Sequence, residues 1–239
     1  MRYLLAFMLL VGLFVIGKRF SCHFGPGIKG EGPVKTESRS VSGFHAVDLS
    51  ISANAEITVS DQYRVEIDAQ ENLLPILKTE VEDGTLRIYF EESVSHSEDL
   101  VVRISAPSFD AFSVAGSGTV HVNSPLRSEK MNLNISGSGN ILLPDGDFGT
   151  LRSVIAGSGD LEIGGRTEAM EAKIAGSGDI DAKKMTAREL DATVAGSGSV
   201  SCDVSERLKA NILGSGDIYY SGSPTVNSNV SGSGDVRKL

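Results

Sequence analysis

The sequence predicts an all-β protein whose main part is a parallel β-helix, a coil of strands in which each turn stacks on the one before. The triplet Gly-Ser-Gly occurs seven times at intervals of 18 to 21 residues, a period that marks a solenoid repeat. Aliphatic residues stand two positions before and four positions after the first glycine of every copy. Glycine is frequent, with 27 in 239 residues, and tryptophan is absent, which suits a narrow core.

The repeat alternates between an apolar and a polar face. The two aliphatic positions have the same parity, so their side chains share one face of a strand, while the odd positions between them are mostly polar. The first glycines are Gly116, Gly137, Gly157, Gly176, Gly196, Gly214 and Gly232. The aliphatic residues before them are Val114, Ile135, Ile155, Ile174, Val194, Ile212 and Val230, and those after them are Val120, Ile141, Leu161, Ile180, Val200, Ile218 and Val236.

The glycines are expected at inward corners, where a Cβ has no room and unusual backbone angles are needed. Stacked turns about 4.8 Å apart would place glycine over glycine and aliphatic over aliphatic. Right-handed winding is expected because parallel crossovers are right-handed. The leucine and asparagine signature of a leucine-rich horseshoe is absent from the repeat. A propeller blade needs about 40 residues, twice the repeat length, so both folds are disfavoured.

Residues 1–22 read as a signal peptide or a membrane anchor. Arg2 precedes an apolar run over 3–16, which is short for a membrane span and typical of a secretory signal. Lys18 and Arg19 follow the run, and positive charge at this place is unusual for a cleaved signal, so an uncleaved membrane anchor is the alternative. Cys22 follows a small residue and is a candidate for lipidation, although Arg19 fits that motif poorly. Residues 23–39, rich in glycine and proline, are expected to be a flexible tether.

Residues 40–110 are expected to form an irregular β-rich cap, continuous with the β-helix of 111–239. A worn copy of the repeat lies at 51–59, with alanine in place of glycine. Glu82-Asp83-Gly84 predicts a hairpin that pairs 80–81 with 86–88. At the other end, residues 237–239 carry charges, which would discourage pairing of the edge strand with another chain. The alternative is that this end is uncapped and stacks onto another copy.

Composition excludes several classes of function. The formal charge of −9, without a basic patch, argues against nucleic-acid binding, and membrane contact is expected only through the N-terminal segment. The second cysteine, Cys202, falls in an inward column and reads as an inert core thiol. Two cysteines and four scattered histidines give neither a disulfide framework nor metal-ligand spacing, so no cofactor is expected.

The repeated unit [Ala/Ser]-Gly-Ser-Gly-[Asp/Asn]-aliphatic resembles the head-GIN domain family, also described as an auto-transporter adhesin domain of unknown function. The segments 214–224 and 230–235 and the opening Gly43-Phe44-His45-Ala46-Val47 carry the same resemblance, which covers about residues 40–236. The resemblance implies a β-helical fold and export, since family members are exported proteins frequent in Bacteroidetes and often lipoproteins. It supplies no catalytic or binding residues.

Two polar columns are the candidate surfaces. The position three after the first glycine holds Asp160, Asp179, Asp217 and Asp235, with Thr119, Asn140 and Ser199 in the other copies. Stacked carboxylates favour calcium, whereas hydrogen bonds to the local backbone are the alternative explanation. The middle serines of the triplets form a second column, either a sugar-binding surface or a hydrogen-bond ladder.

These observations favour a non-catalytic exported protein of the cell envelope. It would be attached to the outer membrane, periplasmic or on the cell surface, and would act as an adhesin or a binding or structural module. Its partner would be a surface ligand, glycan or protein; the oligomeric state stays open. One alternative is a self-assembling β-helical scaffold. The other is a polysaccharide-active β-helix enzyme, with Asp160, Glu162 and Asp179 as neighbouring carboxylates.

Overall fold

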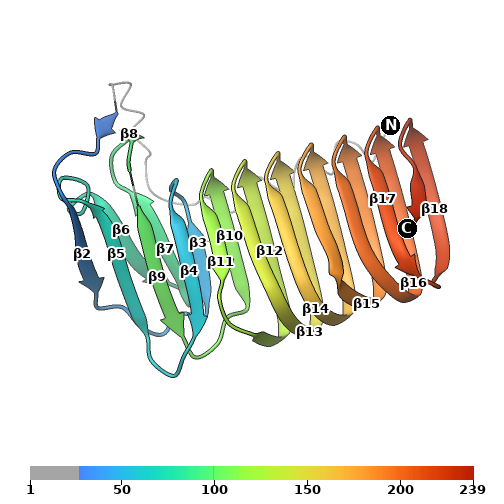
Figure 1. Cartoon of the computed structure of the whole chain (residues 1–239), viewed down its shortest axis with the longest axis horizontal. Coiled ribbons are helices and arrows are strands. Elements are labelled where there is room, and N and C mark those ends of the chain that lie inside the picture. The colour runs from blue at the N-terminus through green and yellow to red at the C-terminus, as the bar shows by residue number, and fades with distance from the viewer. Residues whose placement is uncertain (1–26, 99) are drawn as a thin grey trace.

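The computed structural model describes residues 27–98 and 100–239, and in this part of the chain every regular element is a β-strand. The strands stack into a rod, with the N-terminal strands at one end and β18 at the other (Figure 1). The described residues contain no helix long and apolar enough to cross a membrane. The predicted all-β solenoid is confirmed.

The repeat accounts for the last ten strands. Some of these strands run through a whole turn of the coil, from one glycine corner to the next. They are β10 (Ala111–Gly116), β11 (Thr119–Val122), β12 (Leu126–Gly137), β13 (Asn140–Gly157), β14 (Asp160–Gly176), β15 (Asp179–Gly196), β16 (Ser199–Gly214), β17 (Asp217–Gly222), β18 (Thr225–Gly232) and β19 (Val236–Lys238).

The seven glycine corners lie in line. Parallel pairing brings Gly116 beside Gly137, and the same register continues copy by copy to Gly214 beside Gly232. Two walls meet at this glycine edge. The inbound wall holds the strands that lead into the corners, 46–49, 111–116, 130–137, 150–157, 169–176, 189–196, 207–214 and 225–232. The outbound wall holds the strands that leave them, 54–57, 119–122, 140–143, 160–163, 179–182, 199–202, 217–220 and 236–238.

The core lies between the two walls and is filled by the predicted aliphatic columns. On the inbound wall, Ile174 is 1% exposed and Val194 and Ile212 are 0% exposed; on the outbound wall, Ile180 and Val200 are also fully buried. Side chains alternate along each strand, as the period of two requires. Each turn therefore buries its apolar face against its neighbours, and no turn has a core of its own.

From Gly137 onward, glycine is required at the corners because a Cβ there would point at the preceding turn. At Gly157, where φ is +139°, a Cβ would lie 2.1 Å from the carbonyl oxygen of Gly137. A Cβ at Gly159 would lie 2.0 Å from the carbonyl oxygen of Gly139. The carbonyls of the preceding corner also accept hydrogen bonds from the next corner, as in Ser177 N to Gly157 O at 2.9 Å. The two glycines are thus dictated by the close approach of successive turns.

The worn copy of the repeat forms the turn before Gly116. Strands β3 (Ala46–Leu49) and β4 (Asn54–Val59) pair in register with β10 and β11. Ile51 and Ala53 occupy the two glycine positions and are buried. Side chains are tolerated here because a corner Cβ points away from Gly116, toward the irregular cap.

A set of irregular strands, here called the cap, occupies the N-terminal end of the rod (Figure 1). The predicted hairpin is formed by β6 (Leu77–Glu82) and β7 (Thr85–Phe90), with Asp83 and Gly84 both at positive φ. Strands β7 and β9 (Val101–Ala106) make a further turn that pairs in parallel with β3 and β4. Strand β5 (Arg64–Gln70) adds antiparallel to β9, so the chain builds outward before it returns to β10.

The tether expected at 23–39 is ordered over much of its length. Strand β2 (Val34–Arg39) pairs antiparallel with β5, and β1 (Ile28–Lys29) pairs with β8 (Val94–His96). The antiparallel ladder of β2 fixes six residues whose side chains are mostly exposed and polar. The proposed signal or anchor at 1–22, with Cys22, lies outside the described residues.

Candidate functional site

The four aspartates of the predicted column lie on one line along the outbound wall. Asp160 pairs in register with Asn140 on one side and Asp179 on the other. Ser199 carries the line on to Asp217, and the backbone amide of Asp235 lies 2.8 Å from Oδ1 of Asp217. The side chains stand beside the glycine edge, one per turn.

The column is held together by hydrogen bonds to the backbone of the following turn. Oδ1 of Asp160 accepts from the amide of Asp179 at 3.3 Å. Oδ1 of Asp179 accepts from both the amide and the hydroxyl of Ser199 at 2.7 Å. These bonds occupy Oδ1 of each of the two carboxylates, and Oδ2 is a further acceptor. Among the described residues, no group of three His, Cys, Asp or Glu side chains is arranged to hold a metal ion. The geometry therefore favours local backbone bonding in this column.

The last members of the column are tied to neighbouring side chains. Arg237 donates to Oδ2 of Asp235 at 2.9 Å, and this hydrogen bond lowers the pKa of the Asp235 carboxyl. The Tyr219 hydroxyl donates to Oδ2 of Asp217 at 3.0 Å, which raises the pKa of that phenol. The column thus ends in paired groups.

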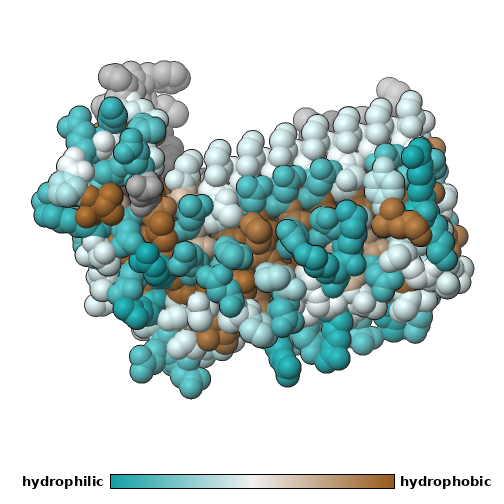
Figure 2. Space-filling model, in the orientation of Figure 1, coloured by the Kyte–Doolittle hydropathy of each residue, from teal (hydrophilic) through white to brown (hydrophobic). Residues whose placement is uncertain are grey.

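The serine column lies on the crest of the glycine edge, and its hydroxyls are free. All seven serines are exposed: Ser117, Ser138, Ser158, Ser177, Ser197, Ser215 and Ser233. From Ser138 onward their backbone amides bond to the preceding corner, but within 27–98 and 100–239 none of the seven hydroxyls has a hydrogen-bond partner. The serine-to-serine ladder considered above is therefore not formed. Figure 2 shows the result as a pale ridge along the upper edge of the rod.

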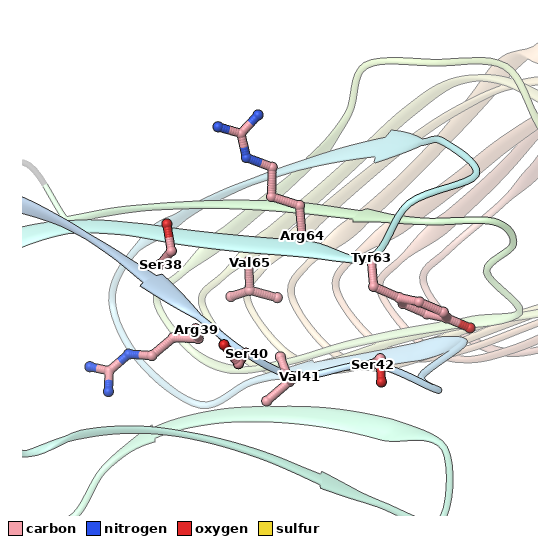
Figure 3. Close-up of a pocket in the computed structure, with 8 residues that line it drawn as sticks. All are labelled: Ser38, Arg39, Ser40, Val41, Ser42, Tyr63, Arg64 and Val65. Carbon is pink, nitrogen blue, oxygen red and sulfur yellow. The ribbon is translucent and has the colours of Figure 1, made fainter.

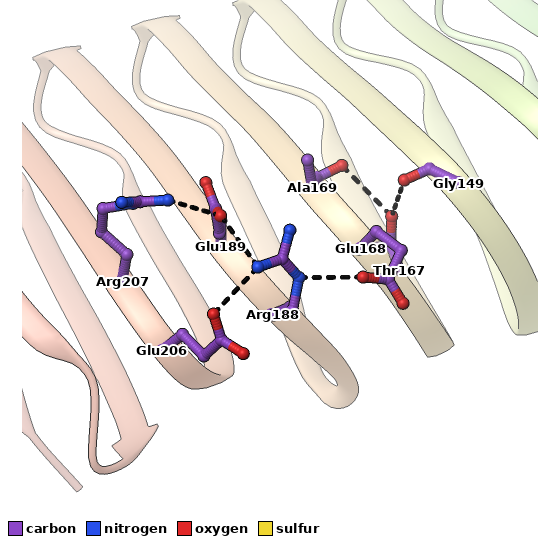
Figure 4. A network of polar contacts seen from close by, with 8 residues as sticks. All are labelled: Gly149, Thr167, Glu168, Ala169, Arg188, Glu189, Glu206 and Arg207. Atoms are coloured by element: carbon purple, nitrogen blue, oxygen red, sulfur yellow. Dashed lines mark hydrogen bonds and ion pairs between the residues drawn. The ribbon is translucent and has the colours of Figure 1, made fainter.

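The opposite edge carries a charged network that the sequence analysis did not single out. Arg188 donates to Glu168 and Glu206, each at 2.9 Å, and lies 3.1 Å from Glu189 (Figure 4). Arg207 donates to Glu189 at 2.5 Å, and this hydrogen bond lowers the pKa of the Glu189 carboxyl. A shallow depression of about 500 Å³ is lined in part by Glu168, Arg188 and Glu206. The signal in the sequence is a Glu-Arg-Glu series, Glu168, Arg188 and Glu206, spaced by one repeat each.

A second depression, of about 440 Å³, lies in the cap between residues 38–42 and 63–65. Its two arginines point away from each other (Figure 3). Arg39 donates to the carbonyl of Leu74 at 2.8 Å, and Arg64 pairs with Glu66 at 2.6 Å. The cationic groups are engaged elsewhere and do not converge on the depression, so it has no assembled anion site.

Cys202 lies in the core, as its column predicted. It is fully buried, and burial raises the pKa of its thiol to about 12. The thiolate that nucleophilic chemistry requires is thus scarce at neutral pH.

Comparison with protein families matches residues 43–224 to the family described as "Putative auto-transporter adhesin, head GIN domain". The chain belongs to this family. None of the curated proteins compared with this head-GIN chain matches it.

Solved structures show the same fold. A protein from Bacteroides fragilis described as a putative adhesin has a TM-score of 0.83 and 24% identity, over 89% of this chain and 100% of that one. Two proteins from Parabacteroides distasonis are 28% identical, and each match covers 89% of this chain and 99% of theirs. One is described as a putative lipid binding protein, with a TM-score of 0.76, and the other as a putative adhesin, with a TM-score of 0.72.

The carboxylates weighed for an enzyme are each engaged in the head-GIN fold. Glu162 pairs with Lys184 at 3.0 Å, while Asp160 and Asp179 bind the backbone of the next turn. They occupy ordinary repeat positions, so the regular stacking accounts for their placement.

Proposed function

We propose that this chain is a non-catalytic, exported binding module of the cell envelope, whose ligand lies along the glycine edge. The observation that carries the proposal is the row of seven exposed serine hydroxyls without partners. They recur once per turn, about 4.8 Å apart. A hydroxyl can both donate and accept a hydrogen bond, so such a row suits an extended polar chain better than a compact ligand.

A glycan is the ligand class that this edge fits best. Its hydroxyls alternate donors and acceptors along a chain, and the neighbouring aspartate column adds further acceptor oxygens. The described adhesin function of structural relatives supports a surface role. The net charge of −9 disfavours anionic polymers as ligands.

Binding to a glycan array tests the proposal. The triple variant Ser158→Ala, Ser177→Ala and Ser197→Ala removes three hydroxyls from the middle of the row without removing a side-chain hydrogen bond of the fold. It should abolish binding to the glycans that the unmodified chain selects. The control is Ser205→Ala, an exposed serine at the opposite edge. Retained binding by the triple variant, or binding only to lipid vesicles, would refute a glycan site on this edge.

Export is tested separately by protease treatment of intact cells and of spheroplasts. Digestion in either preparation supports a location outside the cytoplasm. Complete protection until the inner membrane is lysed would contradict it.

A further inference from the structure

The two ends of the rod differ in chemistry. At the N-terminal end, the outermost strands are β2 and β6, and three of the six residues in each carry a charge. Charged side chains on an edge strand discourage pairing with another chain. At the C-terminal end, β19 carries Arg237 and Lys238, but the eight residues of β18 include no charge and no proline. Of the outermost strands, β18 is therefore the one that lacks charged residues to discourage pairing with another chain.

Strand β18 is also regular and exposed along its whole length. All eight residues pair in register with β16, without a bulge, and all eight are exposed. In the described part of the chain, β16 is the one strand in register with β18. One row of its backbone donors and acceptors is thus directed along the rod axis, where the next turn of a longer solenoid would pair.

The core is open at the same place. Val194 and Ile212 are 0% exposed, but Val230, the next member of their column, is 41% exposed. Leu208 is 0% exposed, and its neighbour Val226 is 38% exposed. Both valines lie at inward positions and lack only a further turn to cover them. Figure 2 shows apolar atoms at this end of the rod.

We infer that the C-terminal end is a self-association surface, on which β18 pairs antiparallel with β18 of a second copy of this chain. A two-fold axis perpendicular to the rod brings the two open ends together and reverses the strand direction across the contact. Antiparallel pairing satisfies both rows of backbone groups and lays the exposed valines of each copy over those of the other. Strand β18 carries no charge, so it meets no like charge when it faces its own copy. On the other wall, Arg237 of β19 is paired with Asp235 at 2.9 Å, which leaves Lys238 as the one remaining cation of that strand.

The contact closes at two copies. Head-to-tail stacking would require β18 to pair with the cap, whose edge strands are charged and antiparallel to their neighbours. A two-fold contact uses the open end of each rod and leaves the cap outward. The rods therefore join into a dimer of twice the length rather than a fibre.

The dimer is expected to be weak. Eight strand residues span about 26 Å, and two walls about 10 Å apart give an end face of about 26 × 10 = 260 Å². This is below the roughly 800 Å² that each partner buries in a standard interface. Association should therefore depend on concentration, and anchoring to a membrane surface would favour it.

Sedimentation velocity of the full chain over a wide concentration range tests the inference. A reversible monomer–dimer equilibrium without larger species is expected. Val230→Lys places a charge on the open end and should weaken dimerisation at least tenfold. Asn211→Lys is the matched control, since it adds the same charge on the outer surface one turn inward, and should change the dissociation constant less than threefold. Far-UV circular dichroism checks that both variants are folded.

Hydrogen exchange locates the contact without a mutation. The amides of β18 should gain protection as concentration rises, while those of β2 should not. A monomer at every concentration overturns the inference, and so do species larger than a dimer. The inference is also overturned if Val230→Lys does not change the dissociation constant of the dimer and the amides of β18 gain no protection. Association would then occur elsewhere, for example through the apolar run at 3–16.

Discussion

Replacing single corner glycines by alanine should separate two reasons for their presence, backbone conformation and close stacking. Gly116 has a φ of +110°, but a Cβ there would meet nothing within 4 Å. Gly176 has a φ of +140°, and a Cβ there would lie 2.1 Å from the carbonyl oxygen of Gly157. Gly178 has no positive φ, yet its Cβ would lie 2.1 Å from the carbonyl oxygen of Gly159. The three positions thus test strain alone, both effects, and stacking alone.

The magnitudes follow from these distances. Real Cβ atoms do not approach closer than 3.0 Å, so Gly176→Ala must move the turns apart by 3.0 − 2.1 = 0.9 Å. The same Gly157 oxygen accepts from Ser177 N at 2.9 Å, and 2.9 + 0.9 = 3.8 Å is too long for a hydrogen bond. Strain at positive φ costs about 1–3 kcal/mol, the lost bond about 1 kcal/mol, and overpacking about 1–3 kcal/mol.

The variants should therefore rank clearly in equilibrium urea unfolding followed by far-UV circular dichroism. Gly116→Ala should lose about 1–3 kcal/mol, from strain alone. Gly178→Ala should lose about 2–4 kcal/mol from overpacking and lost hydrogen bonds, and Gly176→Ala about 3–7 kcal/mol. The last value is comparable to the whole stability of many domains, so this variant should be partly unfolded in water. Equal losses at Gly116 and Gly176 would refute the argument that stacked turns, rather than φ, dictate these glycines.

Three further outcomes follow from the core and the cap. Ser153 is fully buried and its hydroxyl has no partner, so Ser153→Ala should raise the free energy of unfolding by about 1 kcal/mol, while the exposed Ser158→Ala should not change it. A hydrogen bond from Arg103 lowers the pKa of Asp68 below its usual 3.8, so this carboxylate stabilises the fold above that pH. The contribution is lost as the pH falls through the lowered folded pKa, and Asp68→Asn, compared with the unmodified chain by acid titration, should remove that part of the acid sensitivity, about 1 kcal/mol. Cys202, with a thiol pKa of about 12 and no exposure, should react with iodoacetamide only after unfolding, as peptide mapping would show.

The stacked part of the fold could be predicted because each turn contains residues that fix its register against the neighbouring turns. Two glycines fix the corner, and an aliphatic residue on either side fixes which face is buried. A shift of one residue would expose the aliphatic columns and place side chains at the corners. The sequence therefore specifies the pairing of the strands on either side of the glycine edge from Gly116 to Gly232, and the structure has those pairings.

The order of the cap strands could not be predicted, because its strands lack such a mark. The alternation in β7 and β9 indicates strands but not that they pair with β3 and β4 ahead of the repeat. Their partners are distant in sequence, and alternation alone does not choose among them. Strand β2 falls in the expected tether because the tether is inferred from the glycine- and proline-rich residues that precede Val34. The order of β2 comes from its pairing with β5.

The candidate site shows the same division. The position of the aspartate column followed from the repeat, but its hydrogen bonds depend on side-chain geometry that a period does not give. The Arg188 network was missed because its members lie at the corner opposite the glycines, where register shifts by one or more residues between turns. At that corner, equal spacing from the glycine does not mean equal position.

The direction of the corner Cβ atoms explains why the two ends of the rod are not equivalent. A Cβ at Gly118, or at either corner glycine from Gly137 onward, would collide with the preceding turn. Among the copies of the repeat, side chains therefore fill both corner positions only in the turn that carries Ile51 and Ala53. The last turn keeps its glycines because a Cβ at Gly232 would lie 2.0 Å from the carbonyl oxygen of Gly214. Large side chains can therefore replace the corner glycines and cover the core at the N-terminal end, but steric overlap prevents this at the C-terminal end. A cover for the C-terminal end must be added from beyond the repeat, and the uncharged strand β18 offers the surface on which a second copy could provide it.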